Sequence, residues 1–285
     1  MNKVHIVTDS TADLPKKLVD QYNISVVPLK VFFGPESYLD GVELNSSDFF
    51  THLAGSKELP TTSQPSPVEF TEFYQEWVDQ AADIISIHIS AHMSGTIQSA
   101  QLAKKMLNYD GLEVVDSQAV SVVLGMMVLA AARAAAAGLS REEIITLICN
   151  IMTDHRVFFM VDTLEYLQRG GRIGRAQAFL GTVLNVKPIL TIREGLIYPH
   201  EKIRGRKKAI SRLVQLISES YGDSPLFCFL THGSDFEGLQ ALQELVKSKL
   251  NCIEIMDSRL GSVVGAHVGP GLSGLAVCPY KYVNF

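Results

Sequence analysis

The sequence predicts an α/β protein of two domains: an N-terminal parallel sheet flanked by helices, and a C-terminal α/β domain with a mixed sheet. Up to about residue 154, apolar strand patterns alternate with helical patterns, which is typical of a parallel sheet covered by helices. Beyond that point hairpin patterns are interleaved with helices, which indicates a mixed sheet. We therefore place the predicted domains at 1–153 and 154–285.

Composition limits the classes of function. The chain has 285 residues, of which 47% are hydrophobic, so a large core is expected. Its 25 Lys and Arg residues are outnumbered by 30 Asp and Glu residues, which argues against a nucleic-acid-binding protein. The longest apolar run, Ala119 to Ala132, is shorter than the roughly 20 residues of a membrane span. It predicts a buried helix and no stable membrane insertion. Because a strand pattern starts at Val4 without a signal-peptide pattern, we expect a cytoplasmic protein.

The four cysteines lie far apart, and none forms a C-x-x-C pair. They are Cys149, Cys228, Cys252 and Cys278. We interpret them as buried thiols and expect neither a disulfide framework nor a zinc site.

The first predicted strand leads into a segment, Thr8 to Asp13, that is crowded with residues that cap helices. Ser10 or Thr11 is expected to cap a helix starting near Pro15. The segment has a second interpretation, because a strand-to-helix loop with several hydroxyl and carboxyl groups also suits a site. A hairpin is predicted over Val31 to Leu39.

The segment Pro60 to Pro67 is rich in proline and hydroxyl groups. Ser66 and Glu69 make a capping box, so a helix is expected from Pro67, with Thr61 to Gln64 as a fixed loop before it. This loop is either a linker or part of a site.

The stretch from Ile89 to Thr96 joins a predicted strand to a helix that runs to about Tyr109. Its end, Ser94-Gly95-Thr96, aims hydroxyls and backbone N–H groups at one point beside a helix N-terminus, which suits a negative charge. We therefore predict that an anion with a long apolar tail is held here.

The C-terminal half has three features of interest. Tyr166 to Arg175 is a glycine- and arginine-rich loop, followed by a predicted apolar helix from Ala176 to about Leu184. A β-hairpin is expected from Ile189 to His200. Gly265 to Gly271 is a glycine-rich turn between two strands.

Two of these segments carry candidate ligand groups. Arg172 follows two glycines and can bind a carboxylate or phosphate through paired hydrogen bonds. The alternative is a helix C-terminus with a surface arginine. His267 lies among glycines, which let backbone approach a ligand closely. The alternative is an incidental histidine.

A basic cluster opens a predicted helix and consists of Arg204, Arg206, Lys207 and Lys208. The helix dipole disfavours each cation there by ~0.3–1 kcal/mol. A bound phosphate or an acidic partner surface would offset this cost. The alternative is a solvated face whose side chains bend into water.

No assembled catalytic set is visible. Ser94 with His267 as its base would need a nucleophile elbow, but His92 stands where that motif has glycine. The sequence also lacks the phosphate-loop, zinc-protease and dinucleotide motifs. We expect no catalytic residue, no metal site and no cofactor.

Taken together, the chain resembles the DegV family of bacterial fatty-acid-binding proteins. The matching segments follow the family's order over almost the whole chain: Thr8 to Pro15, Pro60 to Pro67, Ile89-Ser90 with Ser94 to Thr96, Gly170 to Ile173, Lys187 to Leu190, Arg204 to Ala209, and His267 with Gly269 to Gly271. Two departures are slight: Met93 stands where the family usually has Leu, and Val268 where Thr is common.

The resemblance implies a carrier that holds one long-chain fatty acid in a tunnel, with the head group near the domain junction. It implies that Thr62 and Ser94 hydrogen-bond the carboxylate, and that Arg172 and His267 surround it. It further implies that a separate fatty acid kinase makes an acyl phosphate from the bound acid for phospholipid synthesis. Arg204 and Arg206 would then contact the phosphate or the kinase.

Elementary physical chemistry agrees with a carrier. A fatty acid needs a few donors for its carboxylate and a long dry slot for its tail. Each buried CH₂ contributes about 0.8 kcal/mol, so the tail largely holds itself. Two alternatives stay open: an acyl or phosphoryl transferase that uses Ser94 or His267, and a binding module for another small anion.

Overall fold

The computed structural model describes residues 4–181 and 185–285. Its strands are β1 (Val4–Asp9), β2 (Ser25–Val27), β3 (Lys30–Phe33), β4 (Glu36–Leu39), β5 (Thr61–Ser63), β6 (Asp83–His88), β7 (Leu112–Asp116), β8 (Arg156–Met160), β9 (Val186–Arg193), β10 (Leu196–Arg204), β11 (Leu226–His232), β12 (Cys252–Arg259) and β13 (Ser273–Pro279). Its α-helices are α1 (Lys16–Gln21), α2 (Ser46–Gly55), α3 (Pro67–Asp79), α4 (Thr96–Leu107), α5 (Val122–Ala136), α6 (Arg141–Asp154), α7 (Glu165–Arg169), α8 (Arg206–Tyr221), α9 (Phe236–Lys249) and α10 (Ser262–Val268). Short 3₁₀ turns are η1 (Ser10–Ala12), η2 (Gly174–Phe179) and η3 (Tyr280–Tyr282).

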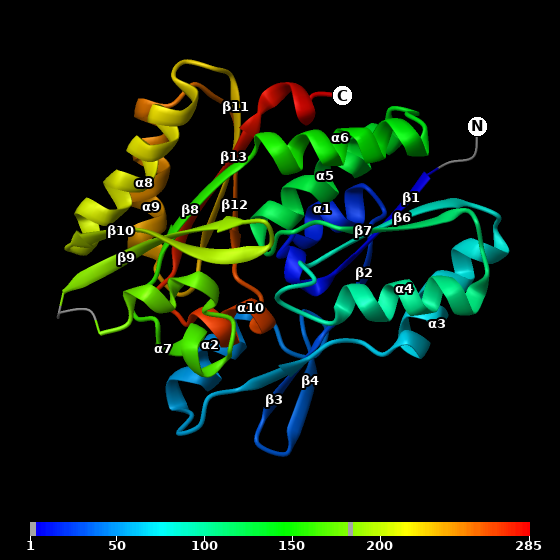
Figure 1. Cartoon of the computed structure of the whole chain (residues 1–285), viewed down its shortest axis with the longest axis horizontal. Helices are drawn as coiled ribbons and strands as arrows, with labels where there is room; N and C mark the ends of the chain where they lie inside the picture. Colours follow the sequence, from blue (N-terminus) through cyan, green and yellow to red (C-terminus); the bar gives the residue numbers. More distant parts are fainter. Residues whose placement is uncertain (1–3, 182–184) are drawn as a thin grey trace.

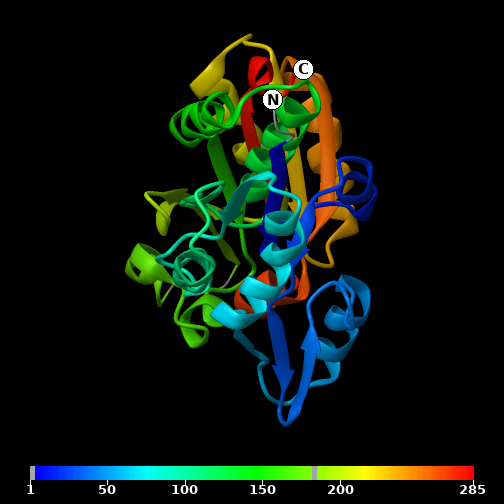
Figure 2. The ribbon, with the colours of Figure 1, turned by 90° about the vertical axis from the view of Figure 1, so that its right-hand side faces the viewer.

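In the described part of the chain the strands form three sheets (Figure 1). A four-stranded sheet of order β2-β1-β6-β7 is parallel throughout. A six-stranded sheet has the order β10-β9-β8-β13-β11-β12, and its only parallel pair is β11 with β12. A small antiparallel sheet, β4-β3-β5, includes the hairpin that extends at the bottom of the view in Figure 2. The predicted fold class, a parallel sheet with helices and a mixed sheet, is confirmed.

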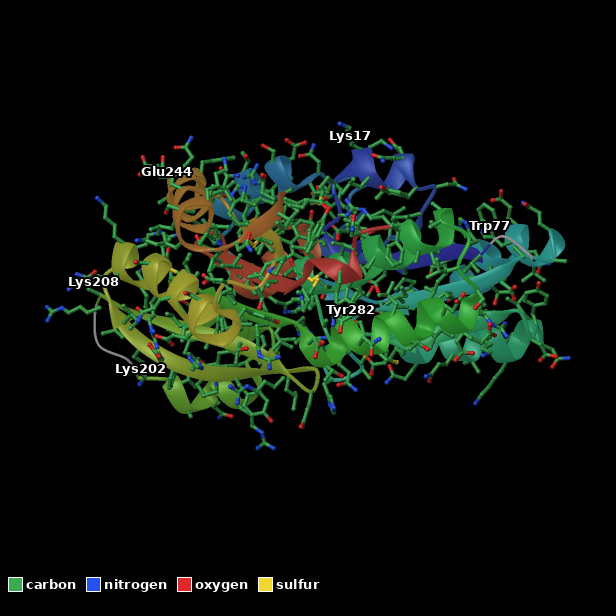
Figure 3. The ribbon with its side chains drawn as sticks, turned by 90° about the horizontal axis from the view of Figure 1, so that it is seen from above. Lys17, Trp77, Lys202, Lys208, Glu244 and Tyr282 are labelled. Carbon is green, nitrogen blue, oxygen red and sulfur yellow. A yellow bond between two sulfur atoms is a disulfide. The ribbon has the colours of Figure 1, made fainter. Side chains whose placement is uncertain are left out.

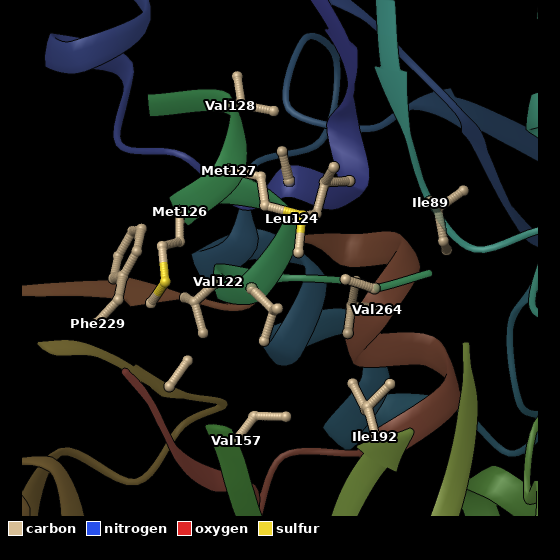
Figure 4. Packing of buried hydrophobic residues seen from close by; sticks show 14 of the residues in the cluster. Ile89, Val122, Leu124, Met126, Met127, Val128, Val157, Ile192, Phe229 and Val264 are labelled. Atoms are coloured by element: carbon tan, nitrogen blue, oxygen red, sulfur yellow. The ribbon is translucent and has the colours of Figure 1, made fainter. Parts of the chain in front are cut away.

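Helix α5 lies between the two larger sheets. It contacts β1 and β6 of the parallel sheet, and β11 and β13 of the mixed sheet. Leu124 and Met126 are fully buried, and Figure 4 shows them among side chains of both halves of the chain. A helix surrounded on all sides must be apolar on all sides. This explains the run that was predicted to be a buried helix. None of the helices in the described ranges is long and apolar enough to cross a membrane.

Helices also cover the outer faces of the two larger sheets (Figures 1 and 2). Helices α3 and α4 pack together, and Phe70 and Tyr74 of α3 join the apolar cluster against β6. Helices α8 and α9 cover the mixed sheet, with Leu213 and Leu242 in its outer cluster.

The parallel sheet ends with β7 and the mixed sheet begins with β8, which lie on opposite sides of residue 154. The boundary between 1–153 and 154–285 stays a prediction.

Several predicted elements differ from the structure. The expected loop before α3 contains strand β5, because Thr62 pairs with Val31 of β3. Helix α1 begins after Pro15 without a side-chain cap, whereas Asp9 caps the short turn η1. A seven-residue helix, α10, stands where a glycine-rich turn was predicted.

The helix predicted from Ala176 to Leu184 is also different. The described residues form the 3₁₀ turn η2, which ends at Phe179. Leu184 lies outside the described residues.

The interpretation of the cysteines as four buried thiols is wrong. Cys228 and Cys252 form a disulfide between β11 and β12, with Cα atoms 6.2 Å apart. Cys149 is an exposed free thiol, and Cys278 is a buried one. The disulfide depends on strand pairing between residues 24 positions apart, so their spacing in the sequence could not predict it.

Candidate functional site

A pocket, with about 580 Å³ of space that includes the solvent at its opening, lies where segments of all three sheets meet. Four residues singled out from the sequence line it: Thr62, Ser94, Arg172 and His267. They come from β5, from the loop before α4, from the loop after α7 and from the last turn of α10. The structure thus brings together side chains that are up to 205 residues apart.

Thr62 and His267 form the polar centre of this cavity. The Thr62 hydroxyl lies 2.8 Å from Nε2 of His267. Nδ1 of His267 is buried and has no hydrogen-bond partner among the described residues. Burial, assisted by the positive charge of Arg172, lowers the pKa of His267 to about 4. The imidazole is therefore neutral at pH 7.

Ser94 lies two residues before the first residue of α4, as the sequence pattern predicts. Its hydroxyl is 2.9 Å from the hydroxyl of Thr96 and accepts the N–H of Thr96 at 3.3 Å. Helix α4 has 12 residues, so its N-terminus supplies a partial positive charge beside the cavity.

Arg172 connects the two halves of the chain at the cavity wall. Its Nε donates to the carbonyl of Met93 at 3.0 Å, and Nη1 donates to the carbonyl of Gly170 at 2.8 Å. Nearby, the Ser90 hydroxyl donates to the carbonyl of Gly195 at 2.9 Å. The loop that carries Ser94 is therefore braced by the C-terminal half.

A second, apolar cavity adjoins the first. The two share the apolar residues Val120, Ile197, Val264 and Val268. The second lies between the start of α5 and strands β8, β9, β11 and β13 of the mixed sheet. Its walls are mainly aliphatic, so an apolar space lies beside the polar end of the site.

The basic cluster is arranged differently from the prediction. Nε of Arg206 donates to Asp235 at 3.0 Å, and Nη1 donates to Asp162 at 2.8 Å. The protein itself therefore supplies the anions that offset this cation at the start of α8. Arg204 is exposed at the end of β10. Lys202 and Lys208 lie at the same end of the molecule (Figure 3).

Two further residues shape the head-group end of the cavity. Gln64 lines it, and its amide packs against Gly95. Gly170 packs against Nδ1 of His267 so closely that a Cβ atom there would collide with the ring. Both residues lie in motifs noted in the sequence, but their contacts depend on the arrangement of distant segments.

The arrangement does not assemble a serine nucleophile with its base. The Ser94 hydroxyl is directed to Thr96, and His267 is bonded to Thr62. Within the described ranges no hydrogen bond joins Ser94 to His267, and no group of three or more His, Cys, Asp or Glu side chains is placed to hold a metal ion.

Comparison with known proteins gives consistent matches along the chain. The family model described as "Uncharacterised protein, DegV family" matches residues 3–280. Protein DegV of Bacillus subtilis is 38% identical over 277 residues, which cover 96% of this chain and 99% of that protein.

Solved structures match over a similar extent. A fatty-acid-binding DegV family protein from Thermus thermophilus is 39% identical, with a TM-score of 0.92 over 98% of this chain and 100% of that one. A stearic-acid-binding protein from Eubacterium ventriosum is 29% identical, with a TM-score of 0.88 over 99% of both chains.

Proposed function

We propose, from the premise that this chain belongs to the DegV family, that it binds one long-chain fatty acid and presents the carboxylate to a separate kinase. The observation that carries the proposal is the cavity itself. Thr62, Ser94, Arg172 and His267 line its polar end, and an apolar cavity adjoins it. This combination suits a molecule with one anionic end and a long hydrocarbon tail.

The proposed roles follow from the chemistry of each group. The hydroxyls of Thr62 and Ser94 donate hydrogen bonds to the carboxylate. The Arg172 guanidinium keeps N–H groups beyond those bonded to Met93 and Gly170, and adds positive charge beside the anion. The tail lies in the aliphatic space beside α5.

One neutral tautomer of His267 fits this role better than the other. With the proton on Nε2, His267 donates to Oγ1 of Thr62, and the Thr62 hydroxyl hydrogen is free for the carboxylate. The buried Nδ1 then carries a lone pair and no unpaired N–H. The other tautomer would bury an N–H without a partner and would turn the Thr62 hydrogen toward His267.

The proposal also includes a reaction of the bound fatty acid with a partner enzyme. In it, an ATP-dependent fatty acid kinase converts the bound acid to an acyl phosphate for phospholipid synthesis, which requires a cytoplasmic location. Arg204 is exposed and available for such a partner. Arg206 would not contact the partner directly, because its guanidinium is bonded to Asp162 and Asp235. It would instead hold the junction of β10 and α8 in place.

The test is mass spectrometry of solvent-extracted protein, followed by titration of stripped protein with palmitate. We expect a long-chain fatty acid to co-purify and palmitate to bind again. An extract without fatty acid and a flat titration would contradict the proposal.

An acyl or phosphoryl transferase is the competing function. It would turn over an ester or ATP without a partner protein. The separation of Ser94 from His267 in the hydrogen-bond pattern favours a carrier. Hydrolysis of a p-nitrophenyl acyl ester or of ATP by the purified protein, lost in Ser94→Ala, would favour the transferase.

A further inference from the structure

The N-terminal end of α10 is held by two buried carboxylates from distant segments. Asp13 accepts the N–H of Gly261 at 2.9 Å, and Asp40 accepts the N–H of Ser262 at 2.8 Å. Only 7% of Asp13 and 3% of Asp40 is exposed. The first N–H groups of a helix have no partner within it, and a neighbouring side chain usually supplies one. Here the partners come from more than 200 residues away.

Other bonds fix the same end of the helix. The Ser121 hydroxyl donates to Asp13 at 2.5 Å, and the Ser46 hydroxyl donates to the carbonyl of Leu260 at 2.5 Å. The start of α10 is thus tied to the segment after β1, the segment around α2 and the start of α5. A shift of α10 would break bonds to all three.

The basic residues near Asp13 and Asp40 are bonded to other groups. Asp13 and Asp40 line a cavity of about 1070 Å³ with two basic residues, Lys16 and Arg259. Lys16 pairs with Asp20 at 2.9 Å, and Arg259 donates to the carbonyl of Gly233 at 2.9 Å. Among the described residues, the N–H groups at the start of α10 therefore join the hydroxyls of Ser121 and Ser10 as favourable partners of Asp13 and Asp40.

The middle of α10 is also closely packed. A Cβ atom at Gly265 would lie 2.7 Å from the ring of Phe49 and 3.0 Å from that of Phe50, both on α2. With its start and its middle held, the helix has little freedom at its last turn. That turn carries His267.

The His267 ring has few bonds of its own. Nε2 contacts Thr62, and Nδ1 has no hydrogen-bond partner in the described structure. Among the described residues, the ring is held only by this bond and by its packing against Gly170, so its position depends on the backbone that carries it. We propose that Asp13 and Asp40 are positioning residues of the head-group site, which place His267 against Thr62 by fixing α10. The effect of Asp13 and Asp40 on fatty-acid binding rests on the proposed function, whereas their effect on the position of His267 does not.

The test compares palmitate with hexadecanol, which has the same tail without a carboxylate. Asp40→Ala should weaken palmitate binding by about tenfold and leave hexadecanol binding nearly unchanged, because only the head group is misplaced. Asp40→Asn keeps an oxygen that can accept the Ser262 N–H, so it should retain most of the affinity for palmitate. Tyr74→Phe removes a buried hydrogen bond to Ser86, far from α10, and is the control for a general loss of stability.

A double-mutant cycle with His267→Ala separates positioning from simple destabilisation. In the His267→Ala background, Asp40→Ala should cause no further loss of palmitate affinity. Equal losses for palmitate and hexadecanol, or additive losses in the cycle, would overturn the proposal. If Asp40→Ala does not fold, Ser262→Pro takes its place. Proline is favourable at the first position of a helix and removes the N–H that Asp40 accepts, together with the Ser262 hydroxyl that donates to the carbonyl of Leu44.

A measurement without ligand keeps this proposal distinct from the proposed function. The NMR titration of His267 should have its midpoint near the low pKa of about 4 in the normal protein. It should move toward the ordinary value of about 6.5 in Asp40→Ala, because a displaced ring becomes hydrated. If palmitate does not bind at all, the proposed function fails, but this titration still tests whether Asp40 holds His267 in place. An unchanged midpoint in Asp40→Ala would contradict that positioning role.

Discussion

His267 combines one hydrogen bond with one buried nitrogen that has no partner among the described residues. In the proposed function, a carboxylate bound beside this nitrogen would change the environment of the ring. The flanking glycines and the resemblance to a family both suggested this histidine, but its burial and its contact with Thr62 could only come from the structure. The sequence places the two residues 205 positions apart.

The first prediction concerns the two hydroxyls. Thr62→Val with Ser94→Ala removes both donors and changes side-chain volume little. Each hydrogen bond to a charged group contributes about 1.5–3 kcal/mol, so palmitate affinity should fall at least about tenfold. Isothermal titration on stripped protein measures this. The matched control is Thr146→Val with Ser248→Ala, which removes two exposed hydroxyls that bond to helix carbonyls. Equal affinity in both double variants would exclude these hydroxyls as carboxylate ligands.

The second prediction concerns pH. Burial and Arg172 lower the pKa of His267 to about 4 in the folded protein, whereas the unfolded chain protonates near 6.5. Between about pH 6.5 and 4 the folded state binds fewer protons, so the free energy of unfolding decreases as the pH falls. A bound carboxylate favours the imidazolium and should raise the pKa of His267. NMR titration with and without palmitate should show this rise. A midpoint that stays constant or falls would argue against direct pairing.

The third prediction uses Gly170. Its φ is not in the left-handed region, so alanine fits the backbone, but its Cβ would collide with Nδ1 of His267. Gly170→Ala should therefore displace the ring and weaken palmitate binding severalfold, while thermal stability changes little. Gly55→Ala is the control, because a Cβ atom there meets nothing within 4 Å. Should Gly170→Ala bind palmitate normally, the position of His267 would not matter for the head group.

At the scale of elements, the sequence predicted best what local chemistry determines. The capping box of Ser66 and Glu69 is present at the start of α3, and the hairpin β3–β4 forms where it was expected. Helix α10 was missed because the segment from Gly265 to Gly271 contains three glycines and a proline, which is the composition of a turn. The start of the helix is bonded to Asp13 and Asp40, which lie more than 200 residues away in the sequence.

The junction of β10 and α8 gives the fourth prediction. Arg204 ends β10 and Arg206 begins α8, and the two side chains have different surroundings. Arg206→Ala should lower the free energy of unfolding by about 2 kcal/mol, since charged hydrogen bonds to Asp162 and Asp235 are lost. Arg204→Ala should leave stability and palmitate affinity unchanged, because this side chain is exposed. If the proposed function holds, Arg204→Ala should slow formation of the acyl phosphate by the kinase. The difference in rate between this variant and the normal protein should be smaller at high salt.

Each arginine variant is the control for the other. Chemical denaturation, palmitate titration and kinase-dependent acyl-phosphate formation are measured on both. Loss of palmitate affinity in Arg204→Ala would place this residue in the pocket. A normal kinase reaction would reduce it to a solvated surface residue.

At the scale of the whole molecule, the chain folds around α5. The apolar run predicted a buried helix, but only the structure shows that both larger sheets pack against it. The predicted boundary near residue 154 describes where the strands change sheet along the chain. The core does not follow this division, because Ile85 and Phe229 belong to one apolar cluster. Long-range packing of this kind leaves no local signal in a sequence.

The last prediction follows from that shared core. Leu124 is fully buried on α5, and the loss of its side chain should lower the free energy of unfolding by about 2–5 kcal/mol. If the two sheets form one cooperative unit, Leu124→Ala should destabilise both by the same amount. Fluorescence of Trp77, the single tryptophan, reports on the N-terminal half. Hydrogen exchange of β11 and β13 reports on the mixed sheet. Both probes should give the same free energy, and palmitate should raise both together, because the proposed slot is bounded by α5 and the mixed sheet. Separate transitions, or stabilisation of one sheet alone by palmitate, would show that the halves unfold independently.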